Sequence, residues 1–332
     1  MWPFSRSCRS KARLVGKTVV ITGANTGIGK ETARDLYRRG ARVILACRDV
    51  AKAHQAVEEL KETSASTSNR EQFKGGPGEL VVRKLDLCSL AGVRKCAKAL
   101  VEEEPAIHIL INNAGVMMAP FSKTEDNFES HIQTNHLGPF LFTLLLLPKL
   151  KASGPGCRVV NVASDFYMVG NIHFEDLNME RNYKASKAYA QSKLANILFT
   201  TELARRLKEA KIEGITAYSL HPGVVSTELS RHVDSTLFPG ARMMFKMLTP
   251  VIKSPQLGAQ TTIYCVVEES IADQSGFFYK ECARVTPFRK ATDPEVAAKL
   301  WKESTRFVGL EDSDDLNKLL ETASEELSSS KM

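Results

Sequence analysis

Two tyrosine–lysine pairs lie close together between residues 183 and 193, and each pair could carry out proton transfer. Tyr183 stands four residues before Lys187, and Tyr189 stands four residues before Lys193. A phenol normally loses its proton near pH ~10. A neighbouring ammonium group favours the phenolate and lowers that pKa. Such a pair could therefore exchange a proton with an alcohol or a carbonyl group at neutral pH.

The polar residues of the predicted helix 185–210 decide between the two pairs. Each residue advances ~100° around a helix axis. The residues that this rotation gathers on one side, which we expect to face solvent, are Gln191, Glu202, Arg205 and Arg206. Tyr189 and Lys193 lie on the opposite side, one turn apart. Tyr183 and Lys187 are displaced by ~240°, so we assign the chemistry to Tyr189 and Lys193 and a surface role to the other pair.

The glycine-rich stretch TGANTGIG at residues 22–29 lies between the first predicted strand and the first predicted helix. In that context, Gly23 allows a tight turn, Gly27 lets the backbone approach a pyrophosphate, and Gly29 permits close packing of helix on strand. The amino end of the helix attracts phosphate. We also expect contacts to a dinucleotide from Asn25, Thr26 and Ile28.

The end of the second predicted strand indicates which dinucleotide is bound. An acidic residue there would select NAD by accepting hydrogen bonds from the ribose. Arg48 occupies that place and can pair with a 2′-phosphate, while Asp49 is expected to cap the next helix. We therefore predict NADP(H). Asp86, followed by Leu87, ends the third strand; it either contacts the adenine or caps a helix.

Ser164 ends the fifth predicted strand, at the edge of an open α/β sheet where ligands bind. Its hydroxyl could hold the substrate oxygen beside Tyr189, and the alternative is a helix or turn cap. His221 is expected to be structural rather than catalytic.

Apolar runs that alternate with helical stretches predict the fold. The expected strands span 17–24, 41–48, 79–87, 107–115, 157–164, 215–223 and 275–282. Strands that are apolar on both faces indicate a parallel sheet covered by helices on both sides. We predict an α/β protein with a Rossmann-type doubly wound sheet of about seven strands, in one domain over 17–310. An acidic tail, 311–332, is expected to be frayed or disordered.

The composition is that of an ordinary globular protein, with 43% hydrophobic and 25% charged residues in a chain of 332. Its seven cysteines are scattered without CxxC spacing, which favours a reducing compartment and argues against disulfides and structural zinc. The net charge of +7 is modest, and no basic helix is interleaved with aromatic residues. We therefore expect neither metal nor nucleic-acid binding.

No run of 18 apolar residues occurs, so we expect no membrane-spanning helix, and residues 140–148 are predicted to form a core helix. Residues 1–16 form a basic tail without a secretory signal. The tail is either solvated or attached peripherally to an anionic membrane, with Trp2 and Phe4 inserted. We expect an intracellular protein, either cytoplasmic or peripheral on the membrane of the endoplasmic reticulum or a mitochondrion.

The motifs occur in the order typical of one enzyme family. They are TGANTGIG, NNAG at 112–115, TNHLG around Asn135, Ser164, YAQSK at 189–193 and HPG at 221–223. The sequence from about 17 to 310 thus resembles the short-chain dehydrogenase/reductase family. The resemblance assigns Asn135 to a proton-relay water held by a kinked helix. It further implies cofactor contacts from Asn113, Ala114, Gly115, Tyr189, Lys193, Pro222, Gly223, Val225 and Thr227, and it leaves a homodimer open.

Within that family, the sequences of several segments are similar to those of the retinol dehydrogenase group. These segments are TGANTGIGKETA, ARVILACRD, IHILINNAGVMM, IHFEDLN and SKLANILFTTELARRL. The resemblance implies an NADP(H)-dependent enzyme that interconverts retinol and retinal or similar lipophilic alcohols and aldehydes. Steroids or lipid aldehydes are alternative substrates, and an NADP-binding scaffold or redox sensor with little activity is a different class. Asp165, after Ser164, departs from the expected small or neutral residue.

Residues 224–258 are expected to form the substrate lid. The stretch FPGARMMFKMLTPVI at 238–252 is rich in flexible apolar side chains, which suit a long lipophilic substrate. Core packing and contact with a membrane, through Arg242 and Lys246, are the alternative interpretations.

Overall fold

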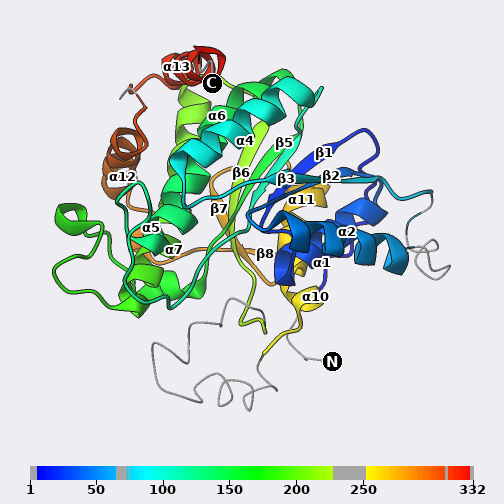
Figure 1. Ribbon diagram of the computed structural model, residues 1–332, viewed down its shortest axis with the longest axis horizontal. Helices are drawn as coiled ribbons and strands as arrows, with labels where there is room; N and C mark the ends of the chain where they lie inside the picture. Colours follow the sequence, from blue (N-terminus) through cyan, green and yellow to red (C-terminus); the bar gives the residue numbers. More distant parts are fainter. Residues whose placement is uncertain (1–5, 65–72, 74, 227–251, 311–312, 330–332) are drawn as a thin grey trace.

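Apolar runs separated by helices form an eight-stranded sheet in the computed structural model, which describes residues 6–64, 73, 75–226, 252–310 and 313–329 (Figure 1). The strand order is β3-β2-β1-β4-β5-β6-β7-β8, and all neighbours are parallel except β7 and β8. The strands are β1 (Thr18–Thr22), β2 (Arg42–Cys47), β3 (Glu79–Lys84), β4 (Ile109–Asn112), β5 (Cys157–Val162), β6 (Ile215–His221), β7 (Phe277–Lys280) and β8 (Ala283–Val285). This is the doubly wound fold that the sequence predicts.

The eighth strand is an addition to the seven that the sequence indicates. Residues 275–282 were expected to form one strand, but β7 ends at Lys280 and the chain turns back into the three-residue strand β8. Glu281 and Cys282 form the turn with φ of 52° and 54°. Positive φ at both central residues is the geometry of a type I′ hairpin, which usually carries Asn-Gly. Neither residue gives that signal in the sequence.

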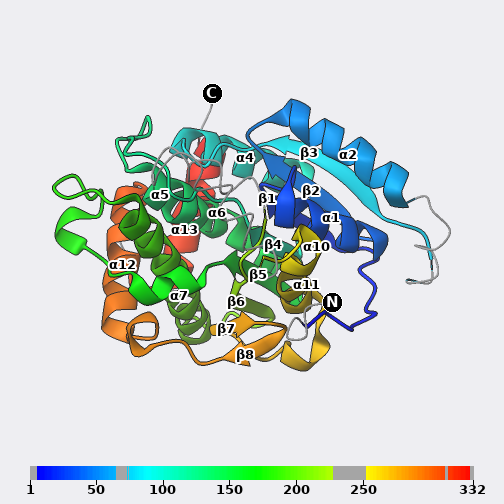
Figure 2. The same cartoon turned by 90° about the horizontal axis from the view of Figure 1, so that it is seen from below.

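Helices cover both faces of the sheet (Figures 1 and 2). One face packs against α1 (Gly27–Arg38), α2 (Val50–Ser64) and α11 (Gln260–Val267), with the short α10 (Pro255–Gly258) at its edge. The other face packs against α4 (Leu90–Glu103), α6 (Gly138–Ala152) and α7 (Ala185–Glu209). The chain runs from β1 to β2 on one side and later enters β4 on the other. This switch point opens a crevice at the carboxyl ends of β1 and β4, where ligands bind in such folds.

The apolar helix α6 lies in the core, as the sequence predicts. Its residues 138–147 are all buried. None of the helices in the described part of the chain is long and apolar enough to span a membrane.

The C-terminal segment differs from the frayed or disordered tail expected over 311–332. Helix α12 (Pro294–Phe307) lies against α7, and helix α13 (Leu316–Ser329) lies against α6 and α4 (Figure 1). Five apolar side chains of α13 are buried: Leu316, Leu319, Leu320, Ala323 and Leu327. Their spacing of three or four residues makes one apolar stripe. The many acids of this segment make its composition typical of a disordered tail, whereas the apolar stripe is typical of a packed helix.

The N-terminal segment is only partly packed over its described residues: Arg6, Arg9 and Lys11 are exposed, as expected of a solvated tail, whereas other residues contact the domain. Leu14 is buried. Arg39 donates hydrogen bonds of 2.9 Å to the carbonyl oxygens of Ser10 and Ala12, and Arg13 donates one of 2.8 Å to Gly76. Trp2 and Phe4, which were predicted to contact a membrane, lie outside the described residues.

Replacing Leu319 by alanine tests whether α13 belongs to the folded core. Leu319 is fully buried, so Leu319→Ala should lower the free energy of unfolding by about 2–5 kcal/mol. The matched control is Glu321→Ala on the exposed side of the same helix, which should change it by less than about 0.5 kcal/mol. Urea denaturation measures both values. Equal, small effects would show that α13 does not pack.

Candidate active site

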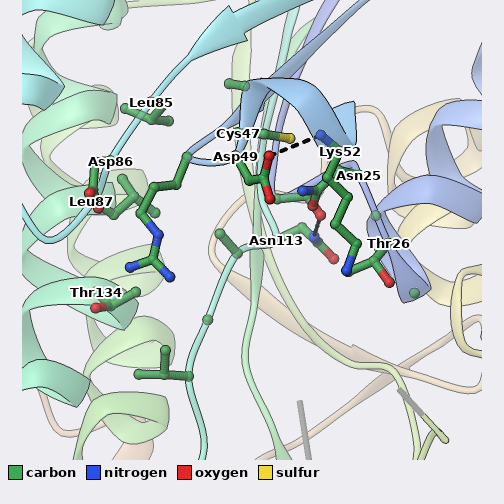
Figure 3. Close-up of a pocket in the computed structure, with 18 of the residues that line it drawn as sticks. Asn25, Thr26, Cys47, Asp49, Lys52, Leu85, Asp86, Leu87, Asn113 and Thr134 are labelled. Carbon is green, nitrogen blue, oxygen red and sulfur yellow. Dashed lines mark hydrogen bonds between the residues drawn. The ribbon is translucent and has the colours of Figure 1, made fainter. Parts of the chain in front are cut away.

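A pocket lies at the switch point and is built around the glycine-rich loop between β1 and α1 (Figure 3). Gly23 and Gly27 have φ of 66° and 54°, which suit glycine. A Cβ on Gly29 would lie 2.5 Å from both Asn113 Nδ2 and the Gly23 carbonyl oxygen. Thr26 begins α1 without a side-chain cap among the described residues. The open amide groups at this helix end fit a phosphate.

The carboxyl end of β4 is tied to the glycine-rich loop by a short hydrogen-bond network. Asn113 Nδ2 donates to the carbonyl oxygens of Thr22 and Gly23, at 2.9 and 3.2 Å. Thr22 Oγ1 accepts from the backbone nitrogens of Asn113 and Ala114, both at 3.0 Å. The NNAG motif therefore fixes the position of the loop.

The pocket brings together most of the predicted cofactor-binding residues. These are Gly23, Asn25, Thr26, Gly27, Ile28, Gly29, Arg48, Asp86, Leu87, Asn113, Ala114 and Gly115. The glycine cradle, the open helix end and the cation at Arg48 fit a dinucleotide phosphate. Sequence reasoning missed Cys47, Lys52, Cys88, Val116 and Thr134, which also line the pocket.

The two acids near Arg48 hold local structure at the rim of the pocket. Asp49 Oδ1 accepts from the backbone nitrogen of Lys52 at 2.9 Å and so caps α2, as expected. Asp86 Oδ1 accepts from Cys88 N at 3.0 Å, while a serine caps α4. Asp86 thus stabilises a turn and lines the pocket as well. The Lys52 side chain extends toward Thr26 (Figure 3), a position set by the cap at Asp49 that sequence spacing did not reveal.

Tyr189 and Lys193 lie buried on α7, next to the pocket but not among its lining residues. Lys193 Nζ donates to the Val162 carbonyl oxygen at 2.9 Å and lies 5.7 Å from the centre of the Tyr189 ring. A Cβ on Gly115, which lines the pocket, would lie 3.5 Å from Lys193 Nζ. The predicted tyrosine–lysine pair therefore lies next to the predicted cofactor-binding residues of the pocket.

Ser164 fills the capping role that the sequence left open, and its hydroxyl also lies beside Tyr189, as the predicted role toward the substrate oxygen requires. Its Oγ accepts from Phe166 N at 3.2 Å and caps the short 3-10 helix Asp165–Val169. The same hydroxyl forms a hydrogen bond with Tyr189. A carbonyl oxygen placed between these two hydroxyl groups could therefore accept from both.

The ionisation of the pair differs from the expectation that Lys193 lowers the pKa of Tyr189. Burial raises the pKa of Tyr189 to about 12, and the hydrogen bond with Ser164 offsets only part of that shift. Burial also lowers the pKa of Lys193 to about 8. Desolvation of the charged form is the main cause of both shifts. At neutral pH Tyr189 therefore carries its proton and is ready to donate it.

The solvent-facing side predicted for α7 holds for Arg205, which is exposed, and is wrong for the other three residues, while Tyr189 is buried as predicted. Gln191, Glu202 and Arg206 are buried. Gln191 Oε1 accepts from His173 N at 2.9 Å, and Arg206 Nε donates to Glu202 Oε1 at 2.7 Å. Each polar group has a specific partner from a loop or from the helix itself, which allows its burial.

Asn135 lies in a π-helical turn, Gln133–Leu137, between the short helix α5 (Ser130–Ile132) and α6. Its Oδ1 accepts from Val116 N at 2.8 Å, and its Nδ2 donates to the Val116 carbonyl oxygen at 2.9 Å and to Ser192 Oγ at 2.8 Å. The turn is the kink that the resemblance implies. Single π-turns of this kind are frequent at functional sites.

Tyr183 and Lys187, the other tyrosine–lysine pair, do not lie together on one face of a helix. Tyr183 precedes α7, which begins at Ala185, and is half-buried; Lys187 is exposed. The Tyr183 hydroxyl donates to the Ala119 carbonyl oxygen at 2.6 Å. The expected surface role is therefore wrong for Tyr183 and agrees with the structure for Lys187.

The loop after β6 contributes only in part to the described site. Gly223 has φ of 95°, and a Cβ there would lie 2.8 Å from Lys253 Cδ. Val225 pairs with Lys253 and lies beside Gly258, near Ile28. Pro222, Gly223 and Val225 do not line the pocket. Thr227 and residues 227–251 of the predicted lid, with its methionines, lie outside the described residues.

Asp165, the unexpected acid after Ser164, joins the ends of three strands. Its carboxylate pairs with Lys280 at the end of β7, and its Oδ2 lies 3.4 Å from His221 Nε2. Its backbone nitrogen donates to His221 Nδ1 at 3.1 Å. Burial lowers the pKa of His221 to about 4, so the ring is neutral at pH 7 and can accept this bond. His221 is structural, as expected.

Comparison with known proteins agrees with this geometry. The short chain dehydrogenase family profile matches residues 17–237, and the chain belongs to the short-chain dehydrogenase/reductase family. It is 46% identical to human retinol dehydrogenase 12, over 91% of this chain and 90% of that protein. It is 48% identical to human retinol dehydrogenase 11 (91% and 89%) and 47% identical to human retinol dehydrogenase 13 (92% and 88%). The chain is thus an oxidoreductase related to retinol dehydrogenases, of a family that uses NAD(P).

Solved structures show the same fold. An uncharacterized protein from Mycobacterium paratuberculosis superposes with a TM-score of 0.71 at 35% identity, covering 92% of this chain and 98% of that one. A short-chain type dehydrogenase/reductase from Mycobacterium marinum has a TM-score of 0.61 at 23% identity, covering 80% and 94%.

Replacing each lysine of the two pairs tests which pair serves catalysis. Lys193→Met keeps the length of the side chain and removes its charge and its donor to Val162 O, so turnover should fall by roughly 10²–10⁴-fold. Lys187→Met, on the exposed side, is the matched control and should leave turnover unchanged. Steady-state kinetics of both variants measure the effect. Similar losses in both, or a loss confined to Lys187→Met, would contradict the assignment.

Proposed function

We propose that this protein is an NADP(H)-dependent oxidoreductase that interconverts retinol and retinal, or similar lipophilic alcohols and aldehydes. One observation carries the proposal: a buried Tyr189 lies against the Ser164 hydroxyl and beside Lys193, and Lys193 lies next to Gly115 of the pocket that is built around the glycine-rich loop. The identities of 45–48% with retinol dehydrogenases support the substrate class.

The mechanism follows from the protonation states of the buried groups. A nicotinamide cofactor, when bound, would supply a hydride to a carbonyl carbon or accept one from an alcohol. Tyr189, whose pKa is about 12, donates its proton to the carbonyl oxygen during reduction. The Ser164 hydroxyl can hold the same oxygen. Lys193, with a pKa of about 8, supplies positive charge beside the phenol at neutral pH, and Asn135 lies where a water could restore the proton. A protonated tyrosine favours reduction.

The choice of NADP(H) rests on cations at the end of β2. Arg48 and Lys52 both line the pocket. Asp49, the acid next to Arg48, is engaged in capping α2. A 2′-phosphate at this rim would therefore meet positive charge, whereas a ribose 2′-hydroxyl would lack the usual acidic acceptor.

The lipophilic substrate class is supported by apolar side chains near Tyr189. The Phe166 ring lies 5.6 Å from the Tyr189 ring, yet Phe166 remains 44% exposed. Met168 and Val169 on the same short helix are also exposed, at 40% and 68%. Exposed apolar side chains grouped on one short element mark a binding surface.

Arg48→Leu tests the cofactor choice. Loss of a charge-assisted bond to the 2′-phosphate should weaken NADPH binding about 10–100-fold and leave NADH binding nearly unchanged. Arg9→Leu, an exposed arginine outside the pocket, is the control. Fluorescence titration with both cofactors measures the change. An unaltered preference for NADPH would contradict the role of Arg48.

A substrate panel tests the proposed activity. With NADPH, all-trans-retinal should give a higher kcat/KM than a steroid ketone or nonenal. Tyr189→Phe removes the proton donor and should lower kcat by roughly 10²–10⁴-fold without weakening NADPH binding. Turnover that survives this substitution would disprove the catalytic assignment. Binding of NADPH without turnover of any carbonyl would support the scaffold alternative.

A further inference from the structure

Ala119, four residues after the NNAG motif, has both of its backbone groups bound by side chains from other elements. The Ala119 amide donates to His131 Nε2 at 3.2 Å. The Tyr183 hydroxyl donates to the Ala119 carbonyl oxygen at 2.6 Å. Ala119 and His131 are buried and Tyr183 is half-buried. The position of this one residue is therefore fixed from two sides.

A buried carboxylate determines which nitrogen of His131 can accept the amide. Glu129 Oε1 lies 2.7 Å from His131 Nδ1, and Glu129 Oε2 accepts from Ile132 N at 3.0 Å. A proton on Nδ1 donates to the carboxylate and leaves Nε2 as an acceptor. Glu129 Oε1 also lies 3.5 Å from the Tyr183 hydroxyl. The one proton of the Tyr183 hydroxyl goes to Ala119, so Glu129 orients His131, one of the two groups that hold Ala119.

The same segment is bound at its other end by the candidate proton-relay residue. Asn135 accepts from the Val116 amide and donates to the Val116 carbonyl oxygen, at 2.8 and 2.9 Å. Between the two fixed residues, Met118 has φ of 54°. A non-glycine residue in that conformation carries strain, which persists only where its surroundings hold it. Residues 116–119 are therefore a short, doubly anchored and strained segment.

This segment begins at the nucleotide pocket, which Val116 lines, and its anchoring residue His131 lies near Tyr189. Val116 follows Gly115, whose added Cβ would lie 3.5 Å from Lys193 Nζ. The His131 ring lies 6.4 Å from the Tyr189 ring. Met118 packs with Met117, Tyr183 and Ala185. Met118 thus lies against the start of α7, the helix that carries Tyr189.

We propose that Glu129, His131 and Tyr183 are positioning residues that hold residues 116–119 as a rigid wall of the substrate site. By fixing Ala119, they set where Met117 and Met118 stand relative to Tyr189. Such a wall discriminates by shape between long apolar carbonyl substrates and short ones. The role in substrate discrimination rests on the proposed function, whereas the anchoring of Ala119 does not. In this proposal Tyr183, the tyrosine of the other tyrosine–lysine pair, serves specificity rather than proton transfer.

Tyr183→Phe tests the wall by removing one oxygen atom and keeping the ring. With the wall loosened, KM for all-trans-retinal should rise about five- to tenfold, as expected for one lost hydrogen bond. The KM for a short aldehyde, kcat and the Kd of NADPH should change by less than about twofold. Tyr264→Phe, a half-buried tyrosine on α11 across the sheet, is the matched control and should change none of these values. An unchanged ratio of the two KM values would overturn the role in specificity.

Amide hydrogen exchange tests the anchoring without any turnover. His131→Leu should raise the exchange rate of the Ala119 amide at least tenfold, while His131→Gln, whose side-chain oxygen can accept in place of Nε2, should restore most of the protection. Slow exchange of the Ala119 amide in the wild type and in both variants would overturn the anchoring. If no carbonyl compound is turned over and Ala119 still responds in this way, the proposed activity fails and the anchoring stands.

Discussion

The buried amino group of Lys193 is the constraint on which the rest of the site depends. A lysine in the interior is costly unless its donors are satisfied, and here Nζ donates to Val162 O at the end of β5. That bond fixes α7 against the sheet, and the same helix carries Tyr189. Because both groups are sealed from water, the phenol keeps its proton and the amine titrates near neutral pH. Depth, rather than the charge of one on the other, sets their acid–base properties.

The parts of the fold and site that the sequence predicts are those with local signals. Buried strands, the glycine-rich loop and the cap at Asp49 each follow from a few adjacent residues. The solvent-facing side of α7 could not be predicted from spacing alone. Gln191 and Glu202 are buried because a loop residue and a neighbouring residue of the helix provide their hydrogen-bond partners. The hairpin at Glu281 and Cys282 has no turn signature, and Lys52 reaches the pocket only because α2 starts where it does.

Side chains from other elements anchor the chain on both sides of Tyr189. Asn135 binds both backbone groups of Val116, and His131 with Tyr183 binds both backbone groups of Ala119. On the other side, His221 and Lys280 hold Asp165, the residue after Ser164. Each catalytic oxygen therefore stands between segments fixed by neutral or paired groups. A site that must place a substrate oxygen against two hydroxyl groups requires this rigidity.

The C-terminal helices enclose the helices that carry Asn135 and Tyr189. Trp301 of α12 packs on Phe140 and Phe199, with ring centres 5.1 and 5.8 Å apart, and Arg206 lies 4.7 Å from the Trp301 ring. Helix α13 covers α6 with its leucines. A homodimer formed through α6 and α7 would have to displace both helices and expose this apolar surface.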